Sequence, residues 1–276
     1  MKRLLTSAVL LPLALAAVFY LPTVAFWLLV VGLIELAAWE ATRIGARWAP
    51  QAPLWLLLVT VPTAAVLLSR LLYEGGDPER LWALLLGLLV LLSVGCGFVV
   101  LLARTPPGEA APALGVVGWG TTYFSTAAVA LWALREIDPW VLLLLLAVVW
   151  LGDTAAYYVG RNLGRHRMAP VVSPKKTWEG AAANLIVAAA TAAAWCLLRL
   201  DVVRWDLVVL AIVVAAGGQL GDLVVSLFKR GAGVKDSGDL LPGHGGMWDR
   251  LDALLVGAPL LLLGLWLLGF DANSLP

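Results

Sequence analysis

Apolar stretches close to the length of a membrane span recur along the whole chain, and they limit its fold more than any other feature. About 20 apolar residues in a helix cross the roughly 30 Å hydrocarbon core of a bilayer. Residues 141–151, VLLLLLAVVWL, lack the polar face that a helix of a soluble protein needs. With a mean hydropathy of +0.92, the sequence predicts an all-α polytopic integral membrane protein with about nine transmembrane helices. The predicted spans are 4–20, 23–42, 54–72, 81–103, 113–133, 139–159, 179–199, 206–226 and 251–270.

The first predicted span has one alternative. Lys2 and Arg3, the apolar run that follows and Ala14-Leu15-Ala16 also resemble a cleavable signal peptide. We favour a retained helix because eight further spans follow, and the sequence leaves open whether this segment is cleaved.

Lysine and arginine are distributed unevenly between the two sides that the spans define. One side carries 14 of the 19 basic residues, and the side richer in Lys and Arg is normally cytoplasmic. We therefore expect the N-terminus and the charged loops 160–178 and 227–250 to lie in the cytoplasm.

The net charge of +1, without a basic arm, indicates no nucleic acid partner. Cys96 and Cys196 lie in apolar runs and are expected to be core residues.

The groups able to do chemistry are concentrated in one part of the chain. We expect a single membrane domain over 1–276, with an N-terminal helical scaffold in 1–135 and a C-terminal catalytic half in 136–276. Residues 219–252, QLGDLVVSLFKRGAGVKDSGDLLPGHGGMWDRLD, are the most informative segment because acids and bases cluster there between two apolar runs. Charges at a membrane boundary are costly, so their clustering indicates a functional site.

The acids of this window are spaced like metal ligands. Asp222 shares a helix face with Gln219, Ser226 and Lys229, although the same spacing would suit a polar stripe in which Asp222 pairs with Lys229. Asp249 and Asp252 also share a face, although acids in a first helical turn favour the helix dipole on their own. Three carboxylates from two helices could converge on Mg²⁺, which usually takes one or two carboxylates plus substrate phosphates.

Basic and glycine residues accompany these acids. Arginine and lysine neutralise phosphate oxygens, and glycines allow a backbone to approach an anion closely. His244 could donate to a phosphate, act as acid or base, or only shape the loop. The residues concerned are Lys229, Arg230, Lys235, Arg250, Gly243, Gly245 and Gly246.

A second charged region covers residues 152–180. Asp153 ends an apolar span and Tyr157 lies one turn further on the same face. In SPKKTWEG, Pro174 after Ser173 predicts a helix start, so Lys175, Lys176 and Thr177 would surround a helix N-terminus suited to anions. Glu179 could cap that turn. The bases Arg161, Arg165 and Arg167 could be topology signals only.

Two further acids, Glu35 and Glu40, flank Trp39 near the predicted end of the second span. We expect them to snorkel or to pair helices rather than to take part in chemistry.

The motifs SLFKR at 226–230, KD at 235–236 and LPGHGGMWDRLD at 241–252 resemble the signature of the phosphatidate cytidylyltransferase (CDP-diacylglycerol synthase) family. QLGD at 219–222, DTAAYYVGR at 153–161 and SPKKTWEG at 173–180 resemble its other recurrent blocks. The similarity is strong over about 150–252, and the rest fits as a hydrophobic scaffold. One position departs from the pattern: Val225 stands where the family often has an acid, so the role of that acid is in doubt here.

The resemblance implies transfer of CMP from CTP to phosphatidate in the bilayer, giving CDP-diacylglycerol and pyrophosphate. It implies Mg²⁺, and it leaves open a second, monovalent cation and a homodimer. We expect a bacterial inner (plasma) membrane location with the site facing the cytoplasm. Expected metal ligands are Asp222, Asp249 and Asp252, and expected catalytic residues are Asp222, Lys229, Arg230, Lys235, Asp236, His244, Asp249 and Arg250. Expected substrate-binding residues are Asp153, Tyr157, Ser173, Lys175, Lys176, Thr177, Ser226, Gly245 and Gly246.

Two other classes deserve comparison. An ion-coupled transporter using Asp153 and Asp222 would place acids near mid-span and show internal repeats, whereas these acids crowd toward one side. A CTP-dependent transferase or kinase acting on another lipid, such as a polyprenol, stays open as a sibling function. The CDP-alcohol phosphotransferases are disfavoured because their acid spacing is absent.

Overall fold

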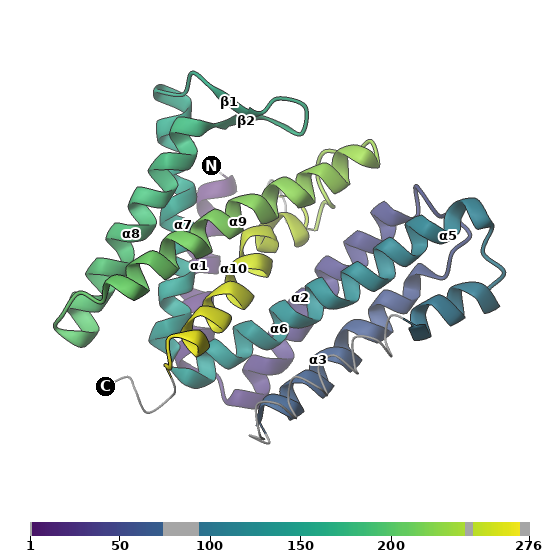
Figure 1. The fold of residues 1–276 in the computed structure, drawn as a ribbon, viewed down its shortest axis with the longest axis horizontal. Coiled ribbons are helices and arrows are strands. Elements are labelled where there is room, and N and C mark those ends of the chain that lie inside the picture. The colour runs from purple at the N-terminus through teal and green to yellow at the C-terminus, as the bar shows by residue number, and fades with distance from the viewer. Residues whose placement is uncertain (1, 74–93, 241–244, 271–276) are drawn as a thin grey trace. The chain divides into compact units, whose positions relative to one another are not determined.

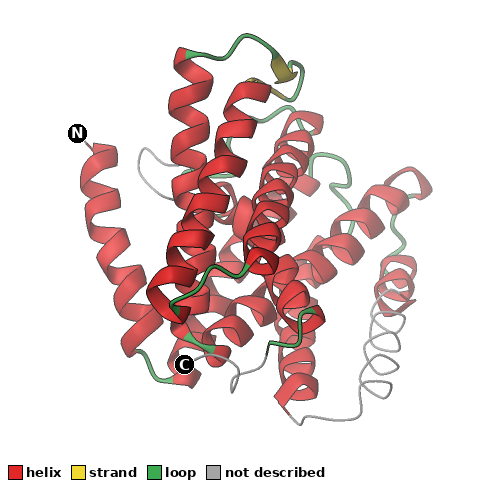
Figure 2. Ribbon diagram, turned by 60° about the vertical axis from the view of Figure 1, so that its left-hand side comes forward, coloured by secondary structure: helices red, strands yellow, loops and turns green. Residues whose placement is uncertain are grey.

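The computed structural model describes the backbone of residues 2–73, 94–240 and 245–270, and the side chains of residues 11–72, 94–240 and 245–270. Figures 1 and 2 show an almost entirely helical chain with one small hairpin, β1 (Arg167–Ala169) and β2 (Ser173–Thr177). The first helices are α1 (Lys2–Tyr20), α2 (Thr23–Gly45), η1 (Leu54–Leu56), α3 (Leu57–Tyr73), α5 (Pro107–Leu114), η2 (Gly115–Trp119) and α6 (Gly120–Ile137). They are followed by α7 (Pro139–Asn162), α8 (Trp178–Leu200), α9 (Trp205–Gly231) and α10 (Trp248–Leu267).

Seven helices within the described residues are long and apolar enough to cross a membrane. They begin at residues 23, 54, 107, 139, 178, 205 and 248, and each overlaps a predicted span. The predicted multi-pass α-helical class is therefore confirmed. Most of the predicted span 81–103 lies outside the described residues. The first predicted span coincides with α1, in which the segment Leu11–Tyr20, where side chains are described, is apolar.

The chain forms two compact units. The first unit consists of Met1–Phe26, Ala130–Arg230 and Leu251–Pro276, and the second of Trp27–Val129 and Gly231–Arg250. The second unit therefore groups the loop at 231–247 with N-terminal helices. The predicted division into 1–135 and 136–276 stays a prediction.

In the first unit, α7 and α8 lie side by side with the hairpin at one end (Figure 1). The Asp138 side chain caps α7 by accepting a hydrogen bond of 2.8 Å from the Trp140 amide. Along α8 the buried face repeats every four residues, and its members are small or of medium size, which lets neighbouring helices approach closely. That stripe consists of Gly180, Asn184, Ala188, Ala192 and Cys196, and the larger Trp195 is buried beside it. Both cysteines are buried free thiols, as predicted.

Glycines set the distance between α9 and α10 in the first unit. A Cβ atom at Gly221 would lie 2.7 Å from Val256 Cγ2 and 2.9 Å from the Asp252 carbonyl oxygen. A Cβ at Gly217 would overlap Leu260. The two helices can approach this closely only because side chains are missing at these positions. The approach carries Asp252 of α10 to the neighbourhood of Asp222 of α9.

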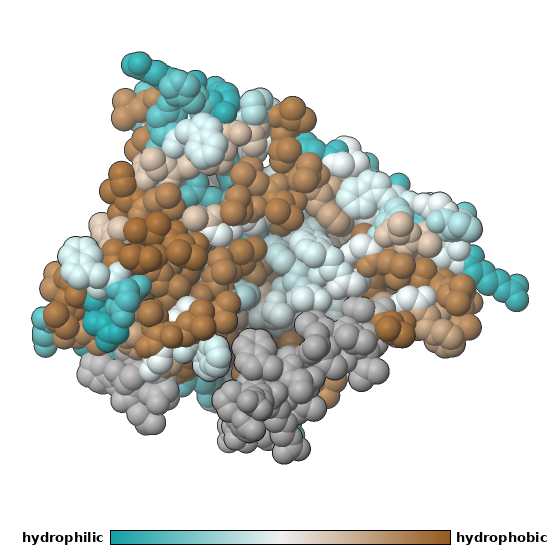
Figure 3. Space-filling view, viewed as in Figure 1, coloured by the Kyte–Doolittle hydropathy of each residue, from teal (hydrophilic) through white to brown (hydrophobic). Residues whose placement is uncertain are grey.

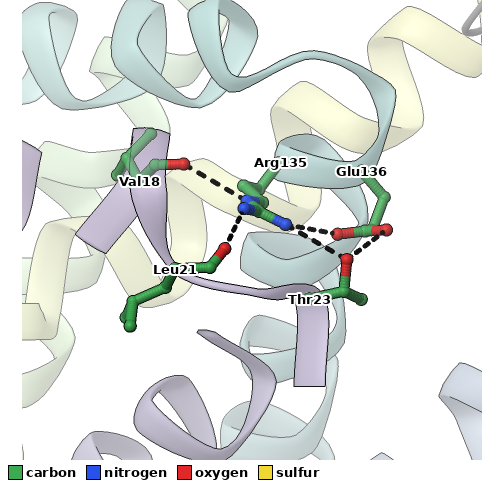
Figure 4. A network of polar contacts seen from close by, with 5 residues as sticks. All are labelled: Val18, Leu21, Thr23, Arg135 and Glu136. Atoms are coloured by element: carbon green, nitrogen blue, oxygen red, sulfur yellow. Dashed lines mark hydrogen bonds and ion pairs between the residues drawn. The ribbon is translucent and has the colours of Figure 1, made fainter. Parts of the chain in front are cut away.

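The connection between α1 and α2 is held by Arg135 of α6 (Figure 4). Its Nε donates to the Val18 carbonyl at 3.2 Å, and its guanidinium also donates to the Leu21 carbonyl and to Thr23 Oγ1. Glu136 balances its charge at 2.9 Å. Carbonyls at a helix C-terminus lack intrahelical partners, so the arginine satisfies groups that the helix itself leaves unpaired.

In the first unit, the hydropathy of the surface changes along the length of the helices. Hydrophilic residues gather at the hairpin end and at the junction of α8 and α9, whereas the sides between them are hydrophobic (Figure 3). This pattern suits helices that cross a bilayer.

We expect Gly221→Ala to destabilise the protein, because the added methyl must displace Val256 or the α10 backbone. Overpacking of this kind costs about 1–3 kcal/mol. The matched control is Gly32→Ala on α2, where a Cβ meets nothing within 4 Å. Both variants gain the same helix propensity, so the difference in thermal midpoint in detergent isolates the packing effect. Equal midpoints would contradict the close-approach argument.

Candidate active site

The helix start predicted in the segment SPKKTWEG is wrong. Ser173–Thr177 forms strand β2, not the start of a helix, and α8 begins only at Trp178. Antiparallel pairing of Arg167 with Thr177 and of Ala169 with Ser173 occupies this segment. A proline is tolerated in an edge strand, which explains Pro174 without a helix start. Thr177 is the N-cap of α8, with its Oγ1 accepting from the Gly180 amide at 3.2 Å.

The hairpin brings a lysine to the acid of α9. Lys176 Nζ lies 2.7 Å from Asp222 Oδ2 and donates to the Gln219 carbonyl at 3.2 Å. The ion-pair partner of Asp222 is therefore Lys176, whereas the sequence offered Lys229 for this role. Lys229 is buried on α9 and interacts electrostatically with both Asp222 and Asp252. Ser226 donates to Asp222 Oδ1 at 3.3 Å, as the shared helix face predicted.

The carboxyl groups of Asp222 and Asp252 are in contact across α9 and α10. Two ionised carboxylates that interact directly repel each other unless nearby cations neutralise their charge. Lys176 and Lys229 supply positive charge here, and a divalent cation bound with substrate phosphates would supply more. This donor set therefore fits Mg²⁺. The described residues contain no cluster of three His, Cys, Asp or Glu side chains suited to a metal, so the set of Asp222, Asp249 and Asp252 stays a prediction.

A polar chain runs from α7 through α8 to α9. The Asn184 side chain donates to Asp153 Oδ1 at 3.4 Å and accepts from Gln219 Nε2 at 3.2 Å. Asn184 is 2% exposed, and a Cβ at Gly152 would lie 2.8 Å from its Nδ2. This asparagine stands alone in an alanine-rich helix, so no sequence pattern predicts its role. It ties the predicted residue Asp153 to the helix that carries Asp222.

Other predicted residues of this region lie nearer the surface. Tyr157 accepts a hydrogen bond from Arg161 at 3.1 Å, and Lys175 is exposed on β2. Arg230 Nε donates to the Val172 carbonyl at 3.2 Å and so ties the end of α9 to the hairpin turn. Glu179 binds His166, with 2.7 Å between Oε1 and Nδ1. The structure thus gives Arg230 and Glu179 contacts that shape the hairpin.

In the second unit, Asp249 organises the loop at 231–247. Its Oδ2 accepts hydrogen bonds from the Ser237 amide at 2.8 Å and the Gly246 amide at 3.2 Å. Gly245 has a φ of +82°, which favours glycine. Lys235, Asp236 and Arg250 are exposed. His244 and Gly243 lie outside the described residues, and the substrate-binding roles of Gly245 and Gly246 stay predictions.

Glu40 also belongs to this loop. It is 1% exposed, and its Oε1 accepts from the Met247 amide at 2.9 Å. Its Oε2 accepts from Ser237 Oγ at 2.6 Å and from the Trp248 amide at 2.9 Å. The expected snorkelling of Glu40 is wrong, because its carboxylate is buried. Its bond to the amide of Trp248, the first residue of α10, agrees with the expected helix-pairing role.

These features define a class: a polytopic α-helical membrane protein with lysines gathered around paired carboxylates, an arrangement suited to phosphate chemistry. The chain belongs to the cytidylyltransferase family, whose model matches residues 1–268. It is therefore a nucleotidyltransferase, which confirms the predicted enzyme class.

Curated relatives are similar over much of the chain. A phosphatidate cytidylyltransferase of Haemophilus influenzae is 32% identical over 278 residues, covering 94% of this chain and 96% of the relative. A protein of the same name from Brucella suis is 40% identical over 199 residues, covering 66% and 70%. One from Staphylococcus saprophyticus is 47% identical over 115 residues, covering 41% and 44%.

We expect Lys176→Ala to lower nucleotidyltransferase activity at least tenfold. The substitution leaves Asp222 without its ion-pair partner, and a hydrogen bond to a charged group contributes about 1.5–3 kcal/mol. A tenfold change in rate corresponds to about 1.4 kcal/mol. The control is Arg165→Ala, which removes an exposed base just before the hairpin. Similar activity losses in the two variants would show that the Lys176–Asp222 pair has no special role.

Proposed function

We propose that this chain transfers CMP from CTP to phosphatidate, giving CDP-diacylglycerol and pyrophosphate in phospholipid biosynthesis. The observation that carries the proposal is the contact of Lys176 with Asp222 beside Asp252, in a chain that belongs to the cytidylyltransferase family. The printed names of its relatives support phosphatidate as the acceptor.

The chemistry needs little from a protein nucleophile. A phosphate monoester has a second pKa of about 6 and is largely a dianion near neutral pH. Phosphatidate can therefore attack the α-phosphorus of CTP directly: a new phosphorus–oxygen bond forms, and the bond to the β-phosphate breaks to release pyrophosphate. The obstacle is the repulsion between two polyanions, so positioning and charge neutralisation carry the catalysis.

The residues of the first unit suit this task. Asp222 and Asp252 would hold Mg²⁺, and the ion when bound would neutralise charge on the CTP phosphates. Lys176 and Lys229 balance the charge of the two acids, and they would bind phosphate oxygens once a cation takes over that role.

The remaining residue roles are kept as proposals. Asp249 would add a metal ligand, and a monovalent cation would share the site if a second ion is needed. Arg230, Lys235 and Arg250 would neutralise phosphate charge. Asp236 is kept as a catalytic carboxylate that would help to hold Mg²⁺, and His244 as a hydrogen-bond donor to phosphate or an acid–base group. The proposed substrate-binding residues are Asp153, Tyr157, Ser173, Lys175, Thr177, Ser226, Gly245 and Gly246.

The membrane arrangement is part of the proposal. We infer nine spans, a cytoplasmic N-terminus and a site facing the cytoplasm of a bacterial inner membrane, where CTP is available; the protein would act as a monomer or a homodimer. The excess of basic residues on one side supports this orientation. A cysteine introduced at the exposed Val171 of the hairpin turn tests it. A membrane-impermeant maleimide should label that cysteine only from the cytoplasmic side.

The reaction is tested with purified protein, Mg²⁺, phosphatidate and CTP labelled at either the α- or the γ-phosphate. Transfer of CMP predicts label in the lipid from α-labelled CTP only. Diacylglycerol is the matched control, because it lacks the attacking phosphate. Lipid labelled from γ-labelled CTP would indicate a lipid kinase, and label in a polyprenyl phosphate but not in phosphatidate would indicate the sibling transferase.

A further inference from the structure

The Glu40 carboxylate joins two parts of one loop. Its three hydrogen-bond donors are Ser237 on one side of residues 238–245, and Met247 and Trp248 on the other. The sequence separation is 197 residues to Ser237 and 208 to Trp248. One side chain of α2 therefore fixes the relative position of both ends of this segment within the second unit.

Because the Glu40 carboxylate is buried, it needs hydrogen bonds from the protein. A carboxylate that is 1% exposed loses its hydration, and the loss is tolerated only when the charge is hydrogen-bonded. Here a hydroxyl and two backbone amides supply the bonds. The amides belong to the start of α10, where unpaired N–H groups and the helix dipole both favour a negative charge.

Two glycines of the loop make room for Glu40. A Cβ at Gly238 would lie 2.7 Å from Glu40 Oε1, and a Cβ at Gly246 would overlap both carboxylate oxygens and Ser237 Oγ. Gly246 thus has a local steric reason that is independent of any phosphate.

Residues just beyond α2 hold the beginning of the same loop. Trp48 Nε1 donates to the Gly231 carbonyl at 3.2 Å, and Arg47 donates to the Ala232 carbonyl at 3.3 Å. Together with Glu40, they contact the loop near residues 231–232, at 237 and at 247–248. Glu40, Arg47 and Trp48 therefore hold the loop in place at these three points.

The loop residues that Glu40 contacts also hold Asp249. Asp249 Oδ2 accepts hydrogen bonds from the amides of Ser237 and Gly246, so its position depends on the same two parts of the loop. We propose that Glu40 is a positioning residue for the nucleotidyl transfer, acting through Ser237 and the start of α10 to hold Asp249 and the neighbouring charged groups in place. The inference rests on the proposed function for its catalytic consequence, and its structural part stands independently.

The test compares Glu40→Gln and Glu40→Asp with Glu35→Gln. Glutamine keeps the shape but turns one acceptor into an NH₂ group that faces N–H donors, whereas aspartate keeps the charge. Glu35 lies on the same helix, and its Oε1 has no hydrogen-bond partner within the described residues. The measurements are kcat, KM for CTP and phosphatidate, thermal midpoint, and hydrogen exchange of peptides covering 237 and 246–248.

We expect Glu40→Gln to lower kcat about tenfold or more, the scale of a lost hydrogen bond to a charged group. KM should change less than kcat, and exchange at 246–248 should become faster. The thermal midpoint should fall too, because a hydroxyl and two backbone amides lose their charged acceptor, and kcat measured well below that midpoint should still be lowered. Glu40→Asp should recover part of kcat. Where Glu40→Gln fails to fold, Ser237→Ala removes one of the three bonds and should lower kcat with the midpoint retained.

Unchanged kcat and unchanged exchange in Glu40→Gln would overturn the proposal. A fall in kcat that only parallels the thermal midpoint, with no recovery in Glu40→Asp, would also overturn it, because Glu40 would then be merely structural. If wild-type protein fails to convert phosphatidate, the proposed function fails, and the exchange measurement still decides whether Glu40 positions the loop.

Discussion

The close approach of α9 and α10 is the constraint on which the candidate site depends. Gly217 and Gly221 leave no room for side chains between these helices. The contact of Asp222 with Asp252 follows from that approach. A chain that is 62% hydrophobic has few ways to keep two carboxylates together at the level of apolar helices. Helix packing brings the acids together, and nearby lysines make the arrangement tolerable.

The hairpin β1–β2 supplies one of these lysines from a segment that is distant in sequence. Lys176 and Asp222 belong to different elements, and the short β2 strand fixes the direction in which Lys176 projects. Arg230 and Glu179 secure the hairpin at its turn and near its base. The polar end of the first unit is thus held by ion pairs and hydrogen bonds, whereas its apolar sides face outward (Figure 3).

The sequence predicted the helices well because a run of apolar residues carries its own signal. Seven spans were found near their predicted places, and Asp222 was recognised as an acid in an apolar helix. The helix start predicted at 173–177 is wrong because SPKKT is short and polar, and Pro174 after Ser173 imitates a helix start. The partner of Asp222 could not be read from helix periodicity, since Lys176 reaches it from a strand.

Glu40 shows the limit of local patterns most clearly. Its neighbours in sequence are those of an ordinary residue near a helix end, while its partners lie about 200 residues away. Asn184 was overlooked for a similar reason, because a single amide in an alanine-rich helix has no periodic signal. Tertiary contacts, not composition, gave these two residues their roles.

Asp222 and Asp252 are proposed to hold a divalent cation together. Binding of Mn²⁺, used in place of Mg²⁺ and followed by electron paramagnetic resonance in the presence of CTP, tests this proposal directly. We expect Asp222→Asn and Asp252→Asn each to weaken Mn²⁺ binding at least about tenfold, a loss of about 1.4 kcal/mol. Asp239→Asn, which changes an exposed acid of the second unit, should bind like the wild type. Equal Mn²⁺ affinity in all four proteins would contradict the claim.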